Sequence, residues 1–484
     1  MKKRVIYGCL IVILLAEKVK MTFTTDTIKR MLLLLILVGM SLGVITPSNA
    51  GELNGRNNVN SMSTIAVNTE WNATYGGTEA DWGNCLIQTT DGGYALVGYT
   101  ESYGAGNGDG WLVKTDASGQ HEWNQTLGGR YSDELGSVIQ TTDGGYVLAG
   151  STSSYGAGED DGWLVKTDAS GQHEWNQTFG YFDGLGSIIQ TTDGGYALVG
   201  DAESYEGVRN GWLVKTDANG QAQWNTTYGG TEDDFLFSVI QTADGGYALV
   251  GYTESYGVGN YDGWLVKTDA NGQAQWNTTY GGTEFDRLSS LIQLADGGYV
   301  LAGTSASYGG NWLLKTDATG QVLWNYNYGS QRGLFSLIQT TDGGYALTGY
   351  CIIEGSGKAN DCYLIRIDAN GQLVWEKIFG GKEMDVGNDL LQAADGDLVI
   401  AGWTGSYGAG DYDMWLLKTP DSPPPSATPT TTPPITTPQV TTPETATPDI
   451  TTSQESDATT AFPNLFSAIV CISVLIIWRK RGNH

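Results

Sequence analysis

The chain has little histidine, cysteine or positive charge. Its 484 residues include five cysteines and three histidines, which are His121, His173 and His484. The sequence contains no histidine cluster, no CxxC pair and no nucleophile elbow. Zinc sites and activated serine or cysteine nucleophiles depend on such groupings, so carboxylate chemistry is the only catalytic chemistry left. We therefore expect a protein that is not an enzyme.

Basic residues are few and concentrate at the two ends. The chain has 25 Lys and Arg against 53 Asp and Glu, which gives a formal charge of −28. Without residues 1–50 and 479–484, 15 basic residues face 51 acidic ones, and the charge is near −36. Such a surface repels phosphate backbones. Nucleic acid is therefore excluded as a partner, and cations or neutral polymers suit this surface better.

The abundant feature is a repeat rich in glycine and aromatic residues, with 69 Gly, 16 Trp and 26 Tyr in the chain. One tryptophan column is Trp71, Trp123, Trp175, Trp224, Trp276, Trp324 and Trp375. A second column is Trp111, Trp163, Trp212, Trp264, Trp312, Tyr363 and Trp415. An Asp-Gly pair begins at Asp91, Asp143, Asp193, Asp244, Asp296, Asp342 and Asp395. Seven copies with a period near 50 residues are typical of β-propellers.

Each period divides into four strand-like segments. In the second period they are GSVIQTT, YVLAGSTS, WLVKTD and HEWNQTFG, and they are separated by an Asp-Gly turn, a longer loop and an ASGQ turn. Asp-Gly and Asn-Gly pairs supply the positive φ angles that tight hairpins require. A parallel β-helix is the alternative, but its coils are shorter and lack two hairpin turns in each repeat. The pattern predicts an all-β fold.

The array begins and ends inside a repeat. It begins at 70–77 with a fourth strand that has no first three, and it ends at 415–419 with a third strand that has no fourth. Together the two pieces make one blade, and closing a ring in this way removes open sheet edges. We predict a seven-bladed β-propeller with four-stranded blades over 70–419, in which the N-terminal strand completes the last blade.

The segments outside the repeats have the composition of targeting and anchoring sequences. Residues 1–50 end in an apolar run and small residues and are expected to be a signal peptide, with Met21 as an alternative start. A short linker, 51–69, follows. Residues 420–461 are rich in Thr and Pro and are expected to form an extended stalk. The segment 462–484 is apolar with a basic end and is expected to be a membrane or sorting segment.

The repeat patterns TxDGGYxLxGxT and DxWLxKxDxxG are similar to those of archaeal and bacterial cell-surface β-propeller proteins. The stretch TDASGQHEW resembles the tryptophan-docking turn of quinoprotein propellers. The C-terminal tail resembles sorting tails of the PGF-CTERM type, with AFPNLF where that family has Pro-Gly-Phe. These resemblances imply an exported protein on the extracellular face, anchored to the cytoplasmic membrane or the cell envelope through its C-terminal segment.

The longer loops of every repeat are expected to lie on one face, which we predict to be the binding surface. An acidic position recurs four residues before the first strand: Asp81, Asp133, Asp183, Asp234, Asp286 and Asp385, with Arg332 in the sixth repeat. Another precedes the third strand: Asp109, Asp161, Asp262, Asp361 and Asp413. The first set is a candidate ligand or cation site, or else it caps turns. The second set suits Ca²⁺, and no other cofactor is expected.

The same loops repeat a tyrosine at Tyr103, Tyr155, Tyr205, Tyr256, Tyr308 and Tyr407. These rings either stack on a sugar or pack over their own hairpins. Sequons follow the first tryptophan column at Asn72, Asn124, Asn176, Asn225 and Asn277, and they are candidates for N-glycosylation. Cys351 and Cys362 are expected to face each other across a hairpin and form a disulfide. Cys85 is expected to be a small buried side chain.

Three classes of function follow from these features. The first is a non-catalytic surface recognition or adhesion module that binds glycan or protein ligands on the long-loop face. The second is a structural component of the cell envelope that self-associates. The third is an enzyme, either a carboxylate-dependent glycoside hydrolase or a quinoprotein-like enzyme. The near-identity of the repeats favours the first two over a specialised catalytic pocket.

Overall fold

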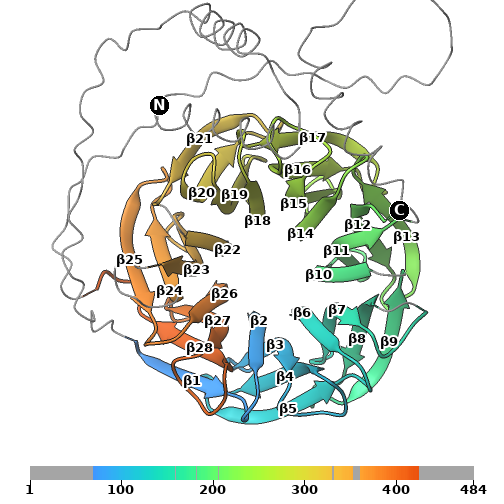
Figure 1. Ribbon diagram of the computed structural model, residues 1–484, viewed down its shortest axis with the longest axis vertical. Helices are drawn as coiled ribbons and strands as arrows, with labels where there is room; N and C mark the ends of the chain where they lie inside the picture. The colour runs from blue at the N-terminus through green and yellow to red at the C-terminus, as the bar shows by residue number, and fades with distance from the viewer. Residues whose placement is uncertain are drawn as a thin grey trace, which may run out of the picture. The chain divides into compact units, whose positions relative to one another are not determined.

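The structure is a computed structural model that describes residues 69–424 apart from 158–159, 181–182, 205–206, 330–331 and 353–359. Within these residues, 28 strands form seven four-stranded antiparallel sheets arranged in a ring (Figure 1). The predicted seven-bladed β-propeller is therefore confirmed. The predicted signal peptide, C-terminal segment and nearly all of the stalk lie outside the described residues. No helix in the described part is long and apolar enough to span a membrane.

Each blade consists of strands a to d, counted in chain order from the centre of the ring outward. Strand a is β2 (Asp81–Gln88), β6 (Asp133–Gln140), β10 (Asp183–Gln190), β14 (Asp234–Gln241), β18 (Asp286–Gln293), β22 (Arg332–Gln339) and β26 (Asp385–Gln392) in blades 1 to 7. Strand b is β3 (Tyr94–Thr100), β7 (Tyr146–Thr152), β11 (Tyr196–Glu203), β15 (Tyr247–Thr253), β19 (Tyr299–Ser305), β23 (Tyr345–Ile352) and β27 (Leu398–Thr404).

Strand c is β4 (Asp109–Thr115), β8 (Asp161–Thr167), β12 (Arg209–Thr216), β16 (Asp262–Thr268), β20 (Gly310–Thr316), β24 (Asn360–Ile367) and β28 (Asp413–Thr419). Strand d is β5 (His121–Leu127), β9 (His173–Phe179), β13 (Ala222–Tyr228), β17 (Ala274–Tyr280), β21 (Val322–Asn327) and β25 (Leu373–Phe379), and β1 (Trp71–Tyr75) is strand d of blade 7.

The ring closes through the N-terminal strand. β1 pairs antiparallel with β28, from Trp71 opposite Lys418 to Tyr75 opposite Met414. Tyr75 is buried and packs in one apolar cluster with Trp111 of blade 1. The N-terminal strand thus belongs to blade 7 and also packs against blade 1, as the incomplete repeats predicted.

The core lies between blades, because the middle strands are buried on both faces. Alternate residues of a strand point to opposite faces of its sheet. On β15, Tyr247 and Leu249 pack against blade 3, whereas Ala248 and Val250 pack against blade 5. A strand with two buried faces needs apolar residues at successive positions, which explains runs such as YALVG in every repeat.

Adjacent blades are also joined through the c–d turns. The Tyr228 hydroxyl of β13 donates a hydrogen bond of 2.6 Å to the Gly272 carbonyl in the next blade's turn. Blade 7 has no such turn, because the chain leaves the ring after Thr419. There, Arg366 bonds the Asp421 carboxylate at 3.1 Å and Lys377 donates to the Pro420 carbonyl at 2.7 Å. These two blade 6 side chains hold the point where the chain leaves the propeller.

Candidate binding face

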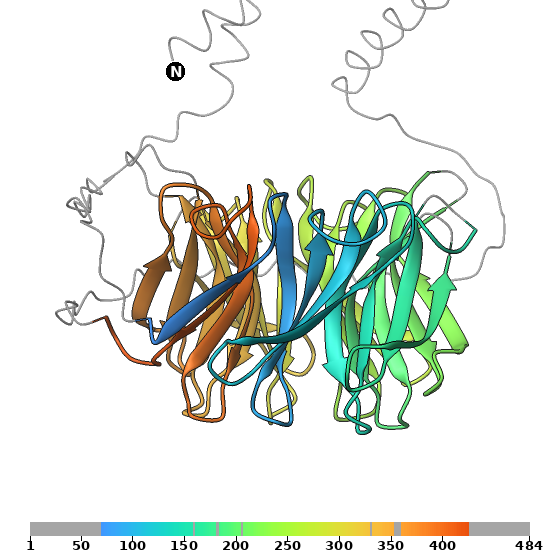
Figure 2. The ribbon, with the colours of Figure 1, turned by 90° about the horizontal axis from the view of Figure 1, so that it is seen from below.

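The two faces of the ring differ in their connections (Figure 2). The a–b and c–d turns form the short-turn face. The b–c and d–a loops form the long-loop face, since they join the opposite ends of the same strands. The predicted separation of long and short connections is therefore present.

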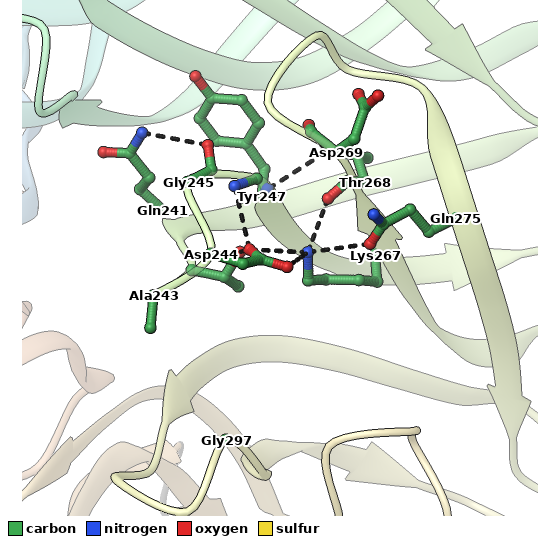
Figure 3. Close-up of polar contacts among 12 residues, drawn as sticks. Gln241, Ala243, Asp244, Gly245, Tyr247, Lys267, Thr268, Asp269, Gln275 and Gly297 are labelled. Carbon is green, nitrogen blue, oxygen red and sulfur yellow. Dashed lines mark hydrogen bonds and ion pairs between the residues drawn. The ribbon is translucent and has the colours of Figure 1, made fainter.

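On the short-turn face, a lysine of strand c lies beside the Asp-Gly turn in every blade except blade 6. In blade 4, Lys267 is 6% exposed, and its Nζ lies 2.9 Å from Asp244 Oδ2 (Figure 3). The same amine donates to the Thr268 carbonyl at 2.7 Å and to Gln275 Oε1 at 3.2 Å. Thr242 and the lysine together lower the pKa of Asp244 to about 2. Every hydrogen of the amine has an acceptor, so this group fixes the turn.

Ion pairs between Lys and the turn aspartate recur in the other blades. They are Lys114–Asp91, Lys166–Asp143, Lys215–Asp193, Lys315–Asp296 and Lys418–Asp395, and Arg366–Asp342 replaces them in blade 6. A charge repeated in every blade and satisfied by its own blade serves folding. The short-turn face therefore offers no free charged group at these positions for a ligand.

Replacing Asp244 with Asn is expected to destabilise the protein by about 1 kcal/mol at pH 7, since the carboxylate is more than half exposed and solvent screens the pair. The folded-state pKa is depressed, so the stabilisation is present above the unfolded pKa near 3.8 and is lost as pH falls through about 2. Urea unfolding of both proteins from pH 7 to pH 2 measures this. The difference should shrink below pH 4, and a difference independent of pH would contradict the assignment.

On the long-loop face, the aspartates that begin strand a are buried beneath the loops. Asp234 is 0% exposed, and its carboxylate accepts hydrogen bonds from the Thr253 hydroxyl, the Ser255 hydroxyl at 2.7 Å and the Gly230 N–H at 2.8 Å. Equivalent bonds hold Asp81, Asp133, Asp286 and Asp385. These five carboxylates join the d–a loop to the b–c loop and do not form a ring open to solvent. The side chains of Asp183 and Arg332 lie outside the described residues.

The aspartates predicted to precede strand c lie at its start, where they cap the b–c loops. Asp109 accepts hydrogen bonds from the Ala105 and Gly106 N–H groups at 3.0 and 3.1 Å. Burial raises its pKa, and the nearby Asp133 carboxylate raises it further. Asp262 and Asp413 cap their loops in the same way, and Asp161 and Asp361 are also buried. Across residues 69–424, gaps excepted, no three His, Cys, Asp or Glu side chains gather closely enough to hold a metal ion.

The loop tyrosines both pack over the blade and reach the surface. Tyr256 is 40% exposed, packs against Trp264 in a tilted arrangement with ring centroids 6.0 Å apart, and donates to the Gly229 carbonyl at 2.6 Å. Tyr103, Tyr155 and Tyr407 make the same contacts and are exposed to a similar extent. Tyr308 makes the same bond but is less exposed, and Tyr205 is not described. Each described ring is fixed by its hydroxyl while part of it faces solvent.

Two further aromatic clusters lie at the long-loop ends of the inner strands, and sequence reasoning missed them. In the Trp82 cluster, Trp82 lies 5.3 Å from Tyr99 and 6.1 Å from Tyr412 between ring centroids, and Tyr412 lies 4.9 Å from Trp403. This cluster joins blades 1 and 7. All four rings are partly exposed, so they contribute to the surface around the centre of the ring.

The second group, the Tyr252 cluster, joins blades 4 and 5. Tyr252 lies 4.9 Å from Phe235, 5.8 Å from Phe237 and 5.1 Å from Tyr261 between centroids. Tyr261 in turn lies 5.1 Å from Phe285, which is 37% exposed. Partly exposed rings held edge to face against one another form a rigid surface that can stack on an apolar or sugar ligand.

Both clusters are built on one cross-strand pair that varies from blade to blade. The pair joins the second residue of strand a to its partner on strand b. It is Trp82/Tyr99, Glu134/Ser151, Gly184/Asp201, Phe235/Tyr252, Arg287/Thr304, Gly333/Tyr350 and Val386/Trp403 in blades 1 to 7. The adjacent pair hardly changes. It joins the first residue of strand a to the next residue of strand b and is Asp with Thr or Ser in most blades. We call these seven the variable pairs, and their variation within a regular repeat was a signal available in the sequence.

The predicted disulfide between Cys351 and Cys362 is not formed. Tyr350, and not Cys351, lies opposite Cys362 in the b–c register of blade 6. Cys351 packs at the interface with blade 5, and Cys362 packs at the interface with blade 7. The two thiols thus lie on opposite faces of one sheet, which no disulfide can span. Cys85 is half-buried and packs against the core between blades 1 and 2. Burial raises the pKa of its thiol, and the nearby Asp389 carboxylate raises it further.

Thiol labelling checks this arrangement. Without reductant, we expect iodoacetamide to leave Cys351 and Cys362 unmodified in the native protein, because both are buried and burial raises the pKa of Cys362. In denaturant, still without reductant, both should be fully alkylated in peptides identified by mass spectrometry. Protection in denaturant that disappears on reduction would contradict this result.

The sequon asparagines lie on the outer d strands. Asn72, Asn124, Asn225 and Asn277 are exposed, and Asn176 is half-buried. In blades 1, 3 and 4, the asparagine Oδ1 accepts a hydrogen bond from the indole of the neighbouring c strand, at 3.2 to 3.4 Å. The exposed asparagines are therefore placed at the perimeter of the propeller, away from the long-loop face.

No known family model matches the chain, and no curated protein is similar to it in sequence. Several solved structures are similar in fold. A protein of unknown function from Dyadobacter fermentans matches 72% of this chain and 98% of its own, with 11% identity and a TM-score of 0.45. The WD40 domain of Neurospora crassa Pan2 matches 70% and 90%, with 8% identity and a TM-score of 0.44. A glucose dehydrogenase matches 60% and 96%, with 12% identity and a TM-score of 0.39.

Proposed function

We propose that this chain is a non-catalytic recognition module, displayed on the outside of the cell, that binds a glycan at the centre of its long-loop face. The seven variable pairs are the observation that supports the proposal. A role in folding favours the same residue in nearly all blades, as the buried aspartates illustrate, whereas recognition of an irregular ligand requires different residues around the ring. The variable pairs differ between blades at equivalent positions of the long-loop face, and partly exposed rings gather around them.

The chemistry around the variable pairs suits a ligand with hydroxyl groups and apolar faces. The Trp82 and Tyr252 clusters offer ring faces for stacking. Arg287 of the blade 5 pair adds a partly exposed cationic side chain, whose guanidinium carbon lies 5.5 Å from the Phe335 centroid. A cation beside aromatic rings suits a ligand that combines apolar faces with hydroxyl or carboxylate groups.

Copying the variable pair of blade 2 into blade 4 tests this proposal. The double variant Phe235→Glu/Tyr252→Ser should fold, because Glu134 and Ser151 already occupy these positions in blade 2. On an array of neutral and acidic oligosaccharides, we expect the variant to lose at least about tenfold in affinity, as removal of central aromatic contacts typically does. Tyr131→Ala is the control, since Tyr131 is 52% exposed in a loop outside both clusters. Equal binding by all three proteins, or none by the natural chain, would contradict the proposal.

Binding is proposed to need no bound ion, because the loop carboxylates already accept hydrogen bonds from their own loops. EDTA is therefore expected to leave glycan binding unchanged.

Display outside the cell is a separate part of the proposal, supported by the apolar segments and the Thr/Pro-rich stretch of the sequence. Protease treatment of intact cells should degrade the propeller, and a propeller that resists protease until the cells are lysed would contradict this part.

A further inference from the structure

The outer perimeter of the propeller has two sectors, which differ in the residues that begin strand d. In β21 these residues are Val322 and Leu323, 45% and 57% exposed, and in β25 they are Leu373 and Val374, 50% and 53% exposed. The same positions hold His-Glu in β5 and β9 and Ala-Gln in β13 and β17. Blades 5 and 6 are neighbours in the ring (Figure 1). Their four exposed aliphatic side chains define what we call the apolar sector.

The sequons divide the perimeter in the same way. Asn72, Asn124, Asn176, Asn225 and Asn277 lie on the d strands of five consecutive blades, from blade 7 through blade 4. In β21 the equivalent stretch is Asn-Tyr-Asn, and in β25 it is Glu-Lys-Ile, so neither carries a sequon. Glycans attached to the five sequons would cover the perimeter everywhere except at the apolar sector.

Charge separates the two sectors as well. Residues 286–379, which form blades 5 and 6, contain eight acidic and six basic residues. The rest of the propeller, 70–285 and 380–419, contains 37 acidic and eight basic residues. Two copies of so acidic a protein repel each other in most orientations. Repulsion is least where two apolar sectors face each other.

The d strands are also sheet edges, whose outer N–H and C=O groups are available for pairing. Natural proteins usually protect such edges with charged residues, as Glu122 and Glu174 do in β5 and β9. An edge strand with exposed aliphatic residues and no charge at this position favours association. We propose that the apolar sector is a homodimer interface, at which β21 and β25 of one chain contact the same strands of a second copy about a twofold axis. The interface is independent of the proposed glycan site.

The double variant Leu323→Glu/Val374→Glu tests the proposal in the full chain purified in detergent. These changes give blades 5 and 6 the glutamate that blades 1 and 2 have, where it pairs with the buried lysine at 2.8 and 3.0 Å. The variant should therefore keep the melting temperature of the natural chain. By light scattering after size exclusion, we expect the natural chain to be dimeric and the variant to dissociate, with a dissociation constant raised at least about tenfold.

The matched control is Gln223→Glu/Gln275→Glu, which adds the same two charges at the equivalent positions of β13 and β17 and should remain dimeric. Three results would overturn the proposal. The natural chain could be monomeric at all concentrations tested. The control could dissociate as readily as the variant. The natural chain could remain monomeric yet sediment with phosphatidylcholine vesicles through the same two residues, which would make the sector a lipid contact.

Discussion

A chain that lacks Trp71–Tyr75 is expected to lose the closed propeller, and not merely one edge strand. β1 supplies the last strand of blade 7 and part of the apolar core between blades 7 and 1. Without it, β28 becomes a sheet edge that was covered in the natural chain, and the buried side of Trp111 loses Tyr75. Exposed apolar edges promote aggregation, so we expect the deletion to yield aggregated or protease-sensitive protein.

Tyr75→Ala tests the contribution of β1 to stability with a smaller change. Tyr75 is 8% exposed, and its hydroxyl donates to the Gly119 carbonyl at 2.7 Å. Loss of a buried aromatic side chain costs about 3–5 kcal/mol, and Tyr75→Phe should cost about 1–3 kcal/mol because a buried carbonyl loses its donor. Thermal unfolding and light scattering measure both. Deletion of 57–61, the same number of residues upstream, is the control, and a β1 deletion as stable as this control would contradict closure by β1.

The closure could be predicted from sequence because it depends only on counting. A repeat that begins at its fourth strand and ends at its third requires the two pieces to meet, whatever their side chains do. The seven-fold columns of Trp and Asp-Gly fixed the strand order in the same way. Period and turn chemistry are local properties, and both are visible in a single chain.

Side-chain direction was harder to predict. The expected disulfide was off by one residue in the b–c register, and because neighbouring residues of a strand point to opposite faces, that slip moved Cys362 to the other side of the sheet. The aspartates that begin strand a were correctly seen as a repeated set, but the sequence does not show that hydroxyls at the end of strand b cover them. The Trp82 and Tyr252 clusters do not show in the repeated columns of the sequence, because their residues differ between blades.

Gly251→Ala is expected to destabilise the protein by about 3 kcal/mol or more, although it adds one methyl group. Gly251 is the last glycine of the DGGYALVG stretch in blade 4, and a Cβ there would overlap the Phe235 carbonyl oxygen. Gly251 pairs with Leu236 of strand a, directly beside the β-bulge between Leu236 and Ser238. Since the obstacle is backbone, no rotamer change can relieve the overlap, and the cost exceeds that of ordinary overpacking.

Gly245→Ala is the matched control, because it changes a glycine of the same stretch for a different physical reason. Gly245 has a φ of 85°, and a Cβ there would meet no atom within 4 Å. Its cost is the left-handed backbone alone, about 1–2 kcal/mol. Urea unfolding of the two variants should therefore rank Gly251→Ala as the more damaging, and the reverse order would show that strands a and b are not so close.

The same close approach holds Phe235 and Tyr252 side by side. Glycan binding should therefore fall with Gly251→Ala and survive Gly245→Ala at temperatures where both variants remain folded.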